Sequence, residues 1–207
     1  MPLRRHTARA LLLAAAILSS GCTAIVTEVA QKAWEDRTTE TQVTDVKIHT
    51  RILQFLTDID GQLPIDVNTD VWRRRILFTG TIDSAALSRR IEKHARADTR
   101  TRAVYNHSRI VSKREKEQRR KRQSTGASAK EKTGQIVSDA WIGAKIKVRL
   151  LASGDIKSVN YRWQSILGHV YIIGHATTRA ERGLVLGILR TTKGVQSVTS
   201  HIEIVSR

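Results

Sequence analysis

Apolar residues recur at every fourth position in two well-separated segments of the chain. One segment is "TDVKIHTRILQFL", beginning at Thr44, and the other is "SDAWIGAKIKVRL", beginning at Ser138. Residues four apart share a helical face, so each segment predicts an amphipathic helix. In both, a Thr or Ser precedes an Asp, which predicts an N-cap followed by an acidic residue at the positive helix end. The apolar positions are Ile48, Ile52 and Leu56, and Ile142, Ile146 and Leu150.

Apolar residues alternate after each of these helices, which predicts strands. A first strand is indicated by Ile65 and Val67 in one half of the chain, and by Val159, Tyr161 and Trp163 in the other. A second strand is expected over residues 75–82 and 169–176. It contains Gly80 or Gly174, where a bulge or close packing leaves no room for a side chain. A second helix is expected from about Ser84 or Thr178, and a third strand over residues 104–111 and 198–205.

The two halves match at a constant offset of 94 residues. Asp45 corresponds to Asp139, and the same offset relates Gly80 to Gly174 and His107 to His201. A constant offset from the first helix to the last strand indicates tandem duplication of one unit, whereas a solenoid needs more copies. The unit has the order αββαβ. The predicted fold class is α+β, with two helices covering one face of a three-stranded mixed sheet in each copy.

The unit resembles the BON domain (bacterial OsmY and nodulation). The residues that carry the resemblance are the helix start "D..I...I...L", the strand "HVYIIGHAT", and "KGVQSVTSHIEIV" from Lys193. The first copy departs at the last motif, where Arg100 and Thr101 replace Gly194 and Val195. The resemblance implies BON domains over residues 38–111 and 135–207, joined by a linker at 112–134, and it implies no catalytic activity.

The N-terminus has the three parts of an export signal. Three arginines precede an uncharged apolar run over residues 10–18, which is too short to span a bilayer. The run ends in Gly21-Cys22, which resembles the lipobox of bacterial lipoproteins, although Ser19 stands where that motif usually has Leu. The resemblance implies a signal peptide over residues 1–21, an acylated Cys22 and a tether over 22–37. A plain signal peptide with an incidental thiol is the alternative.

Charge limits the classes of partner. Three of the 36 Lys and Arg residues lie in the signal, so the mature chain carries 36 − 3 = 33 basic residues against 19 acidic ones, or +14. An anionic partner is expected, such as phospholipid, lipopolysaccharide or a cell-wall polymer, and a well-solvated surface is the alternative. Export argues against nucleic acid.

The sequence contains no motif for catalysis. There is no Gly-x-Ser-x-Gly and no paired-histidine zinc motif, so we expect no enzyme, no metal and no cofactor. His107 and His201 repeat between the copies, and a structural role is favoured for both over a ligand role. Gly183 and Gly187, four residues apart in the second helix, are expected to mark close packing.

The largest difference between the copies lies on the outward face of the first helix. Lys47, Thr50 and Gln54 correspond to Trp141, Ala144 and Val148. An indole beside basic side chains suits a membrane interface, and the BON resemblance implies that this helix binds lipid in related lipoproteins. Burial of Trp141 against the first copy or the linker is the alternative. The predicted lipid-binding residues are Trp141, Lys145, Lys147, Val148 and Arg149.

The remaining surfaces give two more expectations. If Val170 and Ile172 face the helices, Tyr171 and Ile173 form an apolar outer sheet face that packs on the first copy and makes one body. The linker "SKREKEQRRKRQSTGASAKEKTG" lacks apolar periodicity and is predicted to be exposed or disordered. Its basic cluster, Arg119, Arg120, Lys121 and Arg122, is expected to assist contact with anionic lipid. A solvated helix with local pairing to Glu115 and Glu117 is the alternative.

The sequence therefore predicts a non-catalytic lipoprotein that resembles envelope lipoproteins of the DolP type. It would be anchored in the outer membrane, face the periplasm, bind anionic phospholipid through the second domain and support envelope integrity. The absence of Asp at Thr23, directly after Cys22, favours the outer membrane. The alternative function is a lipid-anchored periplasmic interaction module whose partner is a protein or the cell wall.

Overall fold

The computed structural model describes residues 35–124 and 138–205, and those from Arg37 onward belong to one compact unit, Arg37–Arg207. The first copy contains helices α2 (Thr39–Ile59), α3 (Leu63–Asp66) and α4 (Ala85–Arg96) and strands β1 (Val67–Trp72), β2 (Arg75–Ile82), β3 (Ala103–Asn106) and β4 (Arg109–Ile110). Helix α5 (Lys113–Ser124) follows. The second copy contains α6 (Asp139–Leu151), a 3₁₀ turn at Ser158–Asn160, β5 (Tyr161–Ile166), β6 (His169–Ala176), α7 (Arg179–Arg190) and β7 (Ser197–Ile204).

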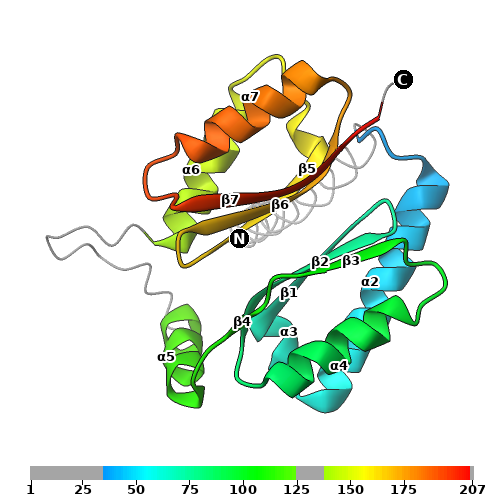
Figure 1. Ribbon diagram of the computed structural model, residues 1–207, viewed down its shortest axis with the longest axis vertical. Helices are drawn as coiled ribbons and strands as arrows, with labels where there is room; N and C mark the ends of the chain where they lie inside the picture. The colour runs from blue at the N-terminus through cyan, green and yellow to red at the C-terminus, as the bar shows by residue number, and fades with distance from the viewer. Residues whose placement is uncertain (1–34, 125–137, 206–207) are drawn as a thin grey trace, which may run out of the picture. The chain divides into compact units, whose positions relative to one another are not determined.

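Each copy is a mixed sheet with its helices on one face (Figure 1). The middle strand pairs antiparallel with the first strand and parallel with the last, in the orders β1-β2-β3 and β5-β6-β7. In the first copy, His107 and Ser108 interrupt the last strand, so its end forms β4 and pairs separately with β2. The predicted α+β fold, with two αββαβ units and three-stranded mixed sheets, is confirmed.

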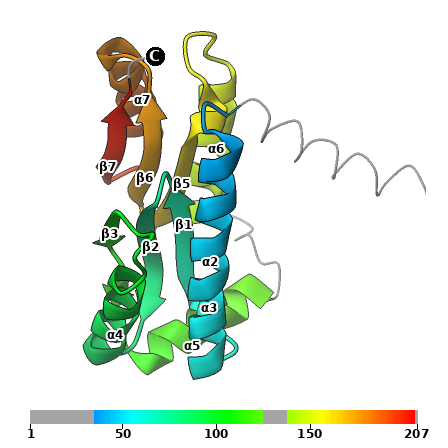
Figure 2. The same cartoon turned by 90° about the vertical axis from the view of Figure 1, so that its right-hand side faces the viewer.

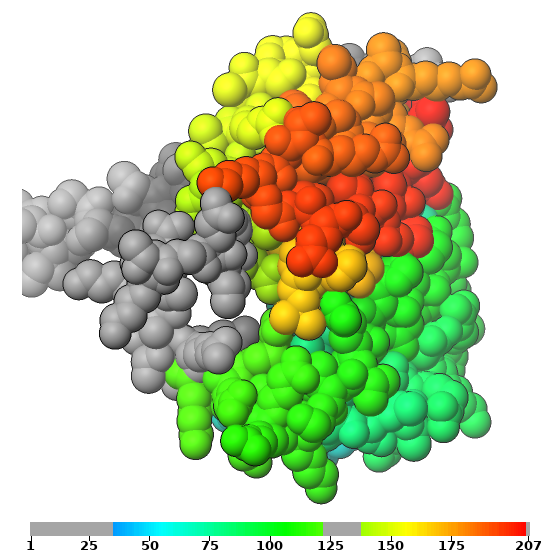
Figure 3. All heavy atoms as spheres, turned by 60° about the vertical axis from the view of Figure 1, so that its left-hand side comes forward, coloured from blue at the N-terminus to red at the C-terminus, as the bar shows by residue number. Residues whose placement is uncertain are grey.

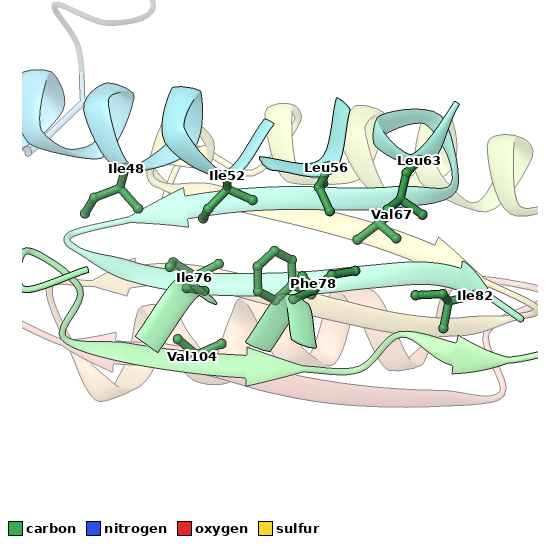
Figure 4. Packing of buried hydrophobic residues seen from close by; sticks show 11 residues of the cluster. Ile48, Ile52, Leu56, Leu63, Val67, Ile76, Phe78, Ile82 and Val104 are labelled. Carbon is green, nitrogen blue, oxygen red and sulfur yellow. The ribbon is translucent and has the colours of Figure 1, made fainter. Parts of the chain in front are cut away.

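The helix periodicity produces the core of each copy. Ile48, Ile52 and Leu56 point from α2 towards Ile76 and Phe78 of β2 (Figure 4). In the second copy, the corresponding Ile142, Ile146 and Leu150 pack with Val170 and Ile172, together with Val185 and Leu189 of α7.

Three predicted boundaries differ from the structure. Helix α2 begins six residues before Asp45 and is capped by Thr38, whose hydroxyl accepts from the Thr41 N–H, so Thr44 lies inside the helix. Ser138 is the N-cap of α6, as predicted. Ile65 lies in α3 and Val159 in the 3₁₀ turn, so both first strands begin later than expected. Pro64 explains the first case, because proline is favoured in the opening turn of a helix.

The repeated aspartate binds a turn in each copy. Asp139 accepts hydrogen bonds from the backbone N–H groups of Leu167 (2.7 Å) and Gly168 (2.8 Å), both of which have positive φ. Asp45 does the same for Arg73 and Arg74, at 2.8 and 2.7 Å. In each copy the aspartate carboxylate therefore binds the hairpin between the first two strands to the first helix. In the second copy, Asp139 also lies in the first turn of that helix.

Glycine is required inside both middle strands, as predicted. A Cβ at Gly174 would lie 2.3 Å from the carbonyl oxygen of Asn160, and one at Gly80 would lie 2.0 Å from that of Asp66. The helical pair Gly183 and Gly187 differs, because a Cβ at either meets no atom of the described residues within 4 Å. Figure 3 shows their helix α7, in orange, on the surface of the second copy. The expectation that this pair marks close packing is therefore wrong.

We predict that Gly174→Ala lowers the free energy of unfolding by about 2–3 kcal/mol, because its methyl group overlaps backbone that cannot move freely. Gly183→Ala is the control. It is expected to leave stability unchanged or raise it by up to about 1 kcal/mol, since alanine is the better helix former. Urea unfolding followed by circular dichroism measures both, and equal effects would contradict the assignment.

The outer face of each sheet contacts the other copy. Trp72, Leu77 and Ile173 form a buried cluster, against which Tyr105 and Tyr171 pack. The Trp72 indole N–H donates to Nδ1 of His175 at 3.2 Å. The prediction that Tyr171 and Ile173 pack on the first copy is confirmed.

Equivalent residues of the two copies meet at this contact. Nε2 of His107 lies 2.9 Å from Nε2 of His201, and Nε2 of Gln164 donates to Asp70 at 3.1 Å. Each pair is 94 residues apart, so the copies are related by an approximate twofold axis near these residues. Arg75, only 1% exposed, donates to the carbonyl oxygens of His201 and Gly174, both at 2.7 Å.

The histidine pair predicts loss of stability in acid. Burial lowers the pKa of His201 to about 4, with His107 and Arg75 contributing, and burial also lowers the pKa of His107. The unfolded chain therefore binds more protons than the folded chain between pH 6.5 and 4, so stability falls as the pH falls through this window. Allowing for partial solvent exposure, we expect His201 to contribute about 1–2 kcal/mol of that loss.

Asp70 acts against the histidines, because burial raises its pKa and its protonation therefore favours the folded state as the pH falls. His201→Gln separates the effect of His201 from that of Asp70. The variant should lose less stability than the wild type between pH 7 and 5 in urea unfolding. Parallel pH curves for the two proteins would show that the pair does not titrate as described.

Candidate functional site

Helix α6 fixes which side chains of the second copy face outward. The Ser138 hydroxyl accepts from the Trp141 N–H at 3.2 Å, which sets the start of the helix. Ile142, Ile146 and Leu150 are then fully buried. With 3.6 residues per turn, Trp141, Lys145 and Val148 fall on the opposite side. The outward direction of the predicted site therefore follows from the core.

This outward face is apolar and basic together. Trp141 is 38% exposed and Val148 is 64% exposed. Nζ of Lys145 lies 5.3 Å from the centroid of the Trp141 ring, within the range of a cation–π contact. Leu151 is 62% exposed and extends the stripe by one turn. Comparison of the two copies in the sequence did not identify Leu151. The doublet Leu150-Leu151 could have indicated it, because one leucine faces inward and the next faces outward. We call Trp141, Lys145, Val148 and Leu151 the α6 face.

The other two predicted residues of this site behave differently. Lys147 is exposed beside the α6 face. Arg149 is half-buried, and its guanidinium donates to the Ile188 carbonyl oxygen and to the hydroxyls of Thr191 and Thr192, each at 2.8 Å. Arg149 therefore binds the C-terminal end of α7, where a cation is favourable.

The basic linker forms helix α5 up to Ser124. Lys116 is buried, with Nζ 3.3 Å from Asp66 and 3.6 Å from Asp83. Nε of Arg120 donates to both carboxylate oxygens of Asp66, at 2.9 and 3.1 Å. These ion pairs hold α5 to the first copy, next to α3 (Figure 2). The expectation of disorder is wrong for Lys113–Ser124, because carboxylates outside the segment hold it as a helix. The expectation of exposure is confirmed for Lys113, Arg114, Glu117, Gln118 and Lys121.

The four predicted cluster residues are accordingly not equivalent. Arg120 is an anchor of α5, and Nη2 of Arg119 lies 3.8 Å from Asp139 of the second copy. Lys121 is exposed, and the side chain of Arg122 lies outside the described residues. Cys22 also lies outside them.

The described residues offer no other chemistry of the kinds sought in the sequence. Within residues 35–124 and 138–205, no three His, Cys, Asp or Glu side chains gather as they would around a metal ion. In the same ranges, no helix has the length and apolar character needed to cross a membrane. The repeated histidines lie in the contact between the copies, which agrees with the structural role predicted for them.

Comparison with known proteins agrees with the duplicated fold. The family model described as BON domain matches residues 44–111 and 138–206. The chain is 24% identical to the outer membrane lipoprotein DolP of Haemophilus influenzae over 195 residues, 91% of each chain. It is 33% identical over 130 residues to an uncharacterized protein from the gshII 5′ region of Anaplasma centrale, covering 63% of this chain and 76% of that protein.

Solved structures offer only weak similarity. CdsD, a structural protein of the type III secretion system of Chlamydia trachomatis, matches with a TM-score of 0.32 and 9% identity over 76% of this chain and 93% of that one. Its C-terminal domain matches with a TM-score of 0.31. These values are too low to support an inference.

The structure predicts that Trp141 contributes little to folding. Trp141→Ala should lower the free energy of unfolding by less than about 1 kcal/mol, because the side chain lies on the surface. Its buried neighbour Ile142, changed to Ala, should cost about 2–4 kcal/mol. Urea unfolding of both variants provides the comparison. A loss for Trp141→Ala as large as that for Ile142→Ala would mean that the indole belongs to the core.

Proposed function

Because the chain belongs to the BON domain family, we propose that it is a non-catalytic envelope lipoprotein of the DolP type, which contacts anionic phospholipid through the α6 face. An acyl anchor on Cys22 would hold it in the outer membrane, facing the periplasm. Its role would be to support the integrity of the envelope. Similarity to an outer membrane lipoprotein along 91% of both chains supports the class and the location.

The observation that carries the lipid proposal is the exposed stripe of the α6 face. Val148 and Leu151 are more than 60% exposed and Trp141 is 38% exposed, on a helix whose opposite side is fully buried. An amphipathic helix of this kind binds a bilayer interface by burying its apolar side chains at headgroup depth. Trp is favoured at that depth, and Lys145 and Lys147 would meet lipid phosphates.

The acyl anchor and the α6 face would act together. Two or three acyl chains hold a protein at a membrane, since each buried methylene contributes about 0.8 kcal/mol. A tethered domain then meets the surface at high effective concentration, so the α6 face needs only modest affinity of its own.

Vesicle flotation tests the proposal. Residues 23–207, which contain the whole compact unit Arg37–Arg207 without the acylated cysteine, are floated with vesicles of phosphatidylcholine alone or with added phosphatidylglycerol or cardiolipin. We expect flotation only with the anionic vesicles, and we expect it to weaken as salt rises. Trp141→Ala should abolish it. Leu184→Ala is the matched control, because Leu184 is exposed on α7, outside the α6 face.

One further variant, with three substitutions, separates the contribution of the linker from that of the α6 face. Arg119, Lys121 and Arg122 are changed to Gln, while Arg120 is kept because it anchors α5. If only this variant fails to float, the linker binds the lipid and the α6 face does not. Absence of flotation for the wild type would overturn the lipid proposal. It would favour the alternative of a periplasmic interaction module, for which insensitivity to salt is expected at an apolar protein interface.

A further inference from the structure

The first copy has a hollow of about 550 Å³ on its helical side, where α2 lies beside the end of α4. The hollow is shallow and largely open to solvent. The hollow is lined by Val46, Lys47, Arg51 and Phe55 of α2, by His94 of α4, and by Arg100. It involves none of the residues of the α6 face.

The wall of the hollow contains an aromatic surface and an unsatisfied polar atom. The Phe55 and His94 rings are stacked, with centroids 3.7 Å apart. Within residues 35–124 and 138–205, Nε2 of His94 is buried and has no hydrogen-bond partner. Burial and the nearby Arg51 lower the pKa of His94, against the opposing effect of Asp98. Since buried polar atoms in proteins are nearly always paired, this nitrogen carries an energetic cost beside the hollow.

Three cations border the same space. Nη1 of Arg51 lies 3.4 Å from Asp98, and Nη2 of Arg100 lies 2.6 Å from it. Asp98 is buried and pairs with both guanidinium groups, while the Arg51 side chain stays 48% exposed. A guanidinium has five donors, so each group keeps donors beyond those directed at Asp98. Lys47 is exposed at the same place.

Carboxylates offset part of this charge. Asp58 also lines the hollow, and its Oδ1 accepts a hydrogen bond from Gln54 at 2.8 Å. Asp58 and Asp98 stand against Lys47, Arg51 and Arg100, and the Arg90 guanidinium lies 5.5 Å from the centroid of the Phe55 ring. The charge at the site is therefore net positive and suits an anion with an apolar part.

The offset between the copies relates this hollow to the α6 face. Adding 94 to Lys47, Arg51 and Gln54 gives Trp141, Lys145 and Val148. The two surfaces are thus the same part of the BON fold. One is an exposed apolar stripe and the other is a shallow hollow with two arginines paired to one aspartate.

We propose that the hollow is a second lipid site, which binds the phosphodiester headgroup of an anionic phospholipid. The Arg51 and Arg100 guanidinium groups donate to the phosphate oxygens, a geometry that arginine favours over lysine. Val46 and Phe55 contact the glycerol and the first acyl carbons. The choice of ligand rests on the proposed function, since it requires that the protein meets anionic lipid, but the site itself is independent of Trp141.

The test is a titration of ¹⁵N-labelled residues 23–207 with dihexanoyl phosphatidylglycerol below its micelle concentration, followed by amide chemical shifts. We expect saturable shifts at Lys47, Arg51, Phe55 and His94. Arg51→Gln should weaken binding about tenfold, and Lys47→Gln, which breaks no ion pair shown by the structure, should weaken it severalfold. Arg89→Gln, which removes an exposed charge from α4 outside the hollow, should change the affinity less than twofold.

Two further arms identify the ligand and separate the two proposals. Glycerol 3-phosphate should bind at least tenfold more weakly than the lipid, and equal affinity would overturn the assignment to a lipid headgroup. Trp141→Ala should leave the shifts at the hollow unchanged, even where it abolishes flotation. Absence of shifts at the hollow, or equal weakening by Arg51→Gln and Arg89→Gln, would overturn the second site while leaving the α6 proposal intact.

Discussion

The contact between the outer faces of the two sheets governs the rest of this structure. Arg75 is almost fully buried there, and burial lowers its pKa, yet its guanidinium binds two backbone carbonyl oxygens of the second copy and lies 3.3 Å from Glu203. A buried charge is tolerated only when it is paired and hydrogen-bonded in this way. The surrounding apolar cluster and the histidine pair are removed from water by the same contact.

Burial of the outer faces leaves each copy with its helical side for other partners. The two helical sides are equivalent positions of a duplicated unit, but they carry different chemistry. The second copy exposes Trp141, Val148 and Leu151, whereas the first presents Arg51 and Arg100 around a hollow. Duplication keeps the residues that the fold requires and leaves the outward positions free to diverge. The functional proposals accordingly rest on residues that differ between the copies.

Charge in the linker illustrates why net charge predicts partners poorly. The run from Lys113 to Arg122 would attract an anionic surface if all its cations were free. Lys116 and Arg120 instead bind Asp66, which is itself buried, and Arg119 lies near Asp139. Part of the positive charge therefore fixes α5 to the first copy. That part of the charge is not available to an anionic surface.

The sequence by itself determined the αββαβ unit, its duplication, the middle strands and the outward direction of Trp141. These follow from local periodicity and from an offset of 94 residues, because a helix or strand shows its buried face as a repeating pattern. The tertiary structure alone decided the contacts between distant residues. Asp45 and Asp139 bind hairpins nearly 30 residues away, His107 meets His201, and Lys116 binds Asp66. Such pairings depend on where the chain returns in space, which no local pattern encodes. The hollow beside Arg51 has the same origin, since α2 and α4 form it only when both pack on one sheet.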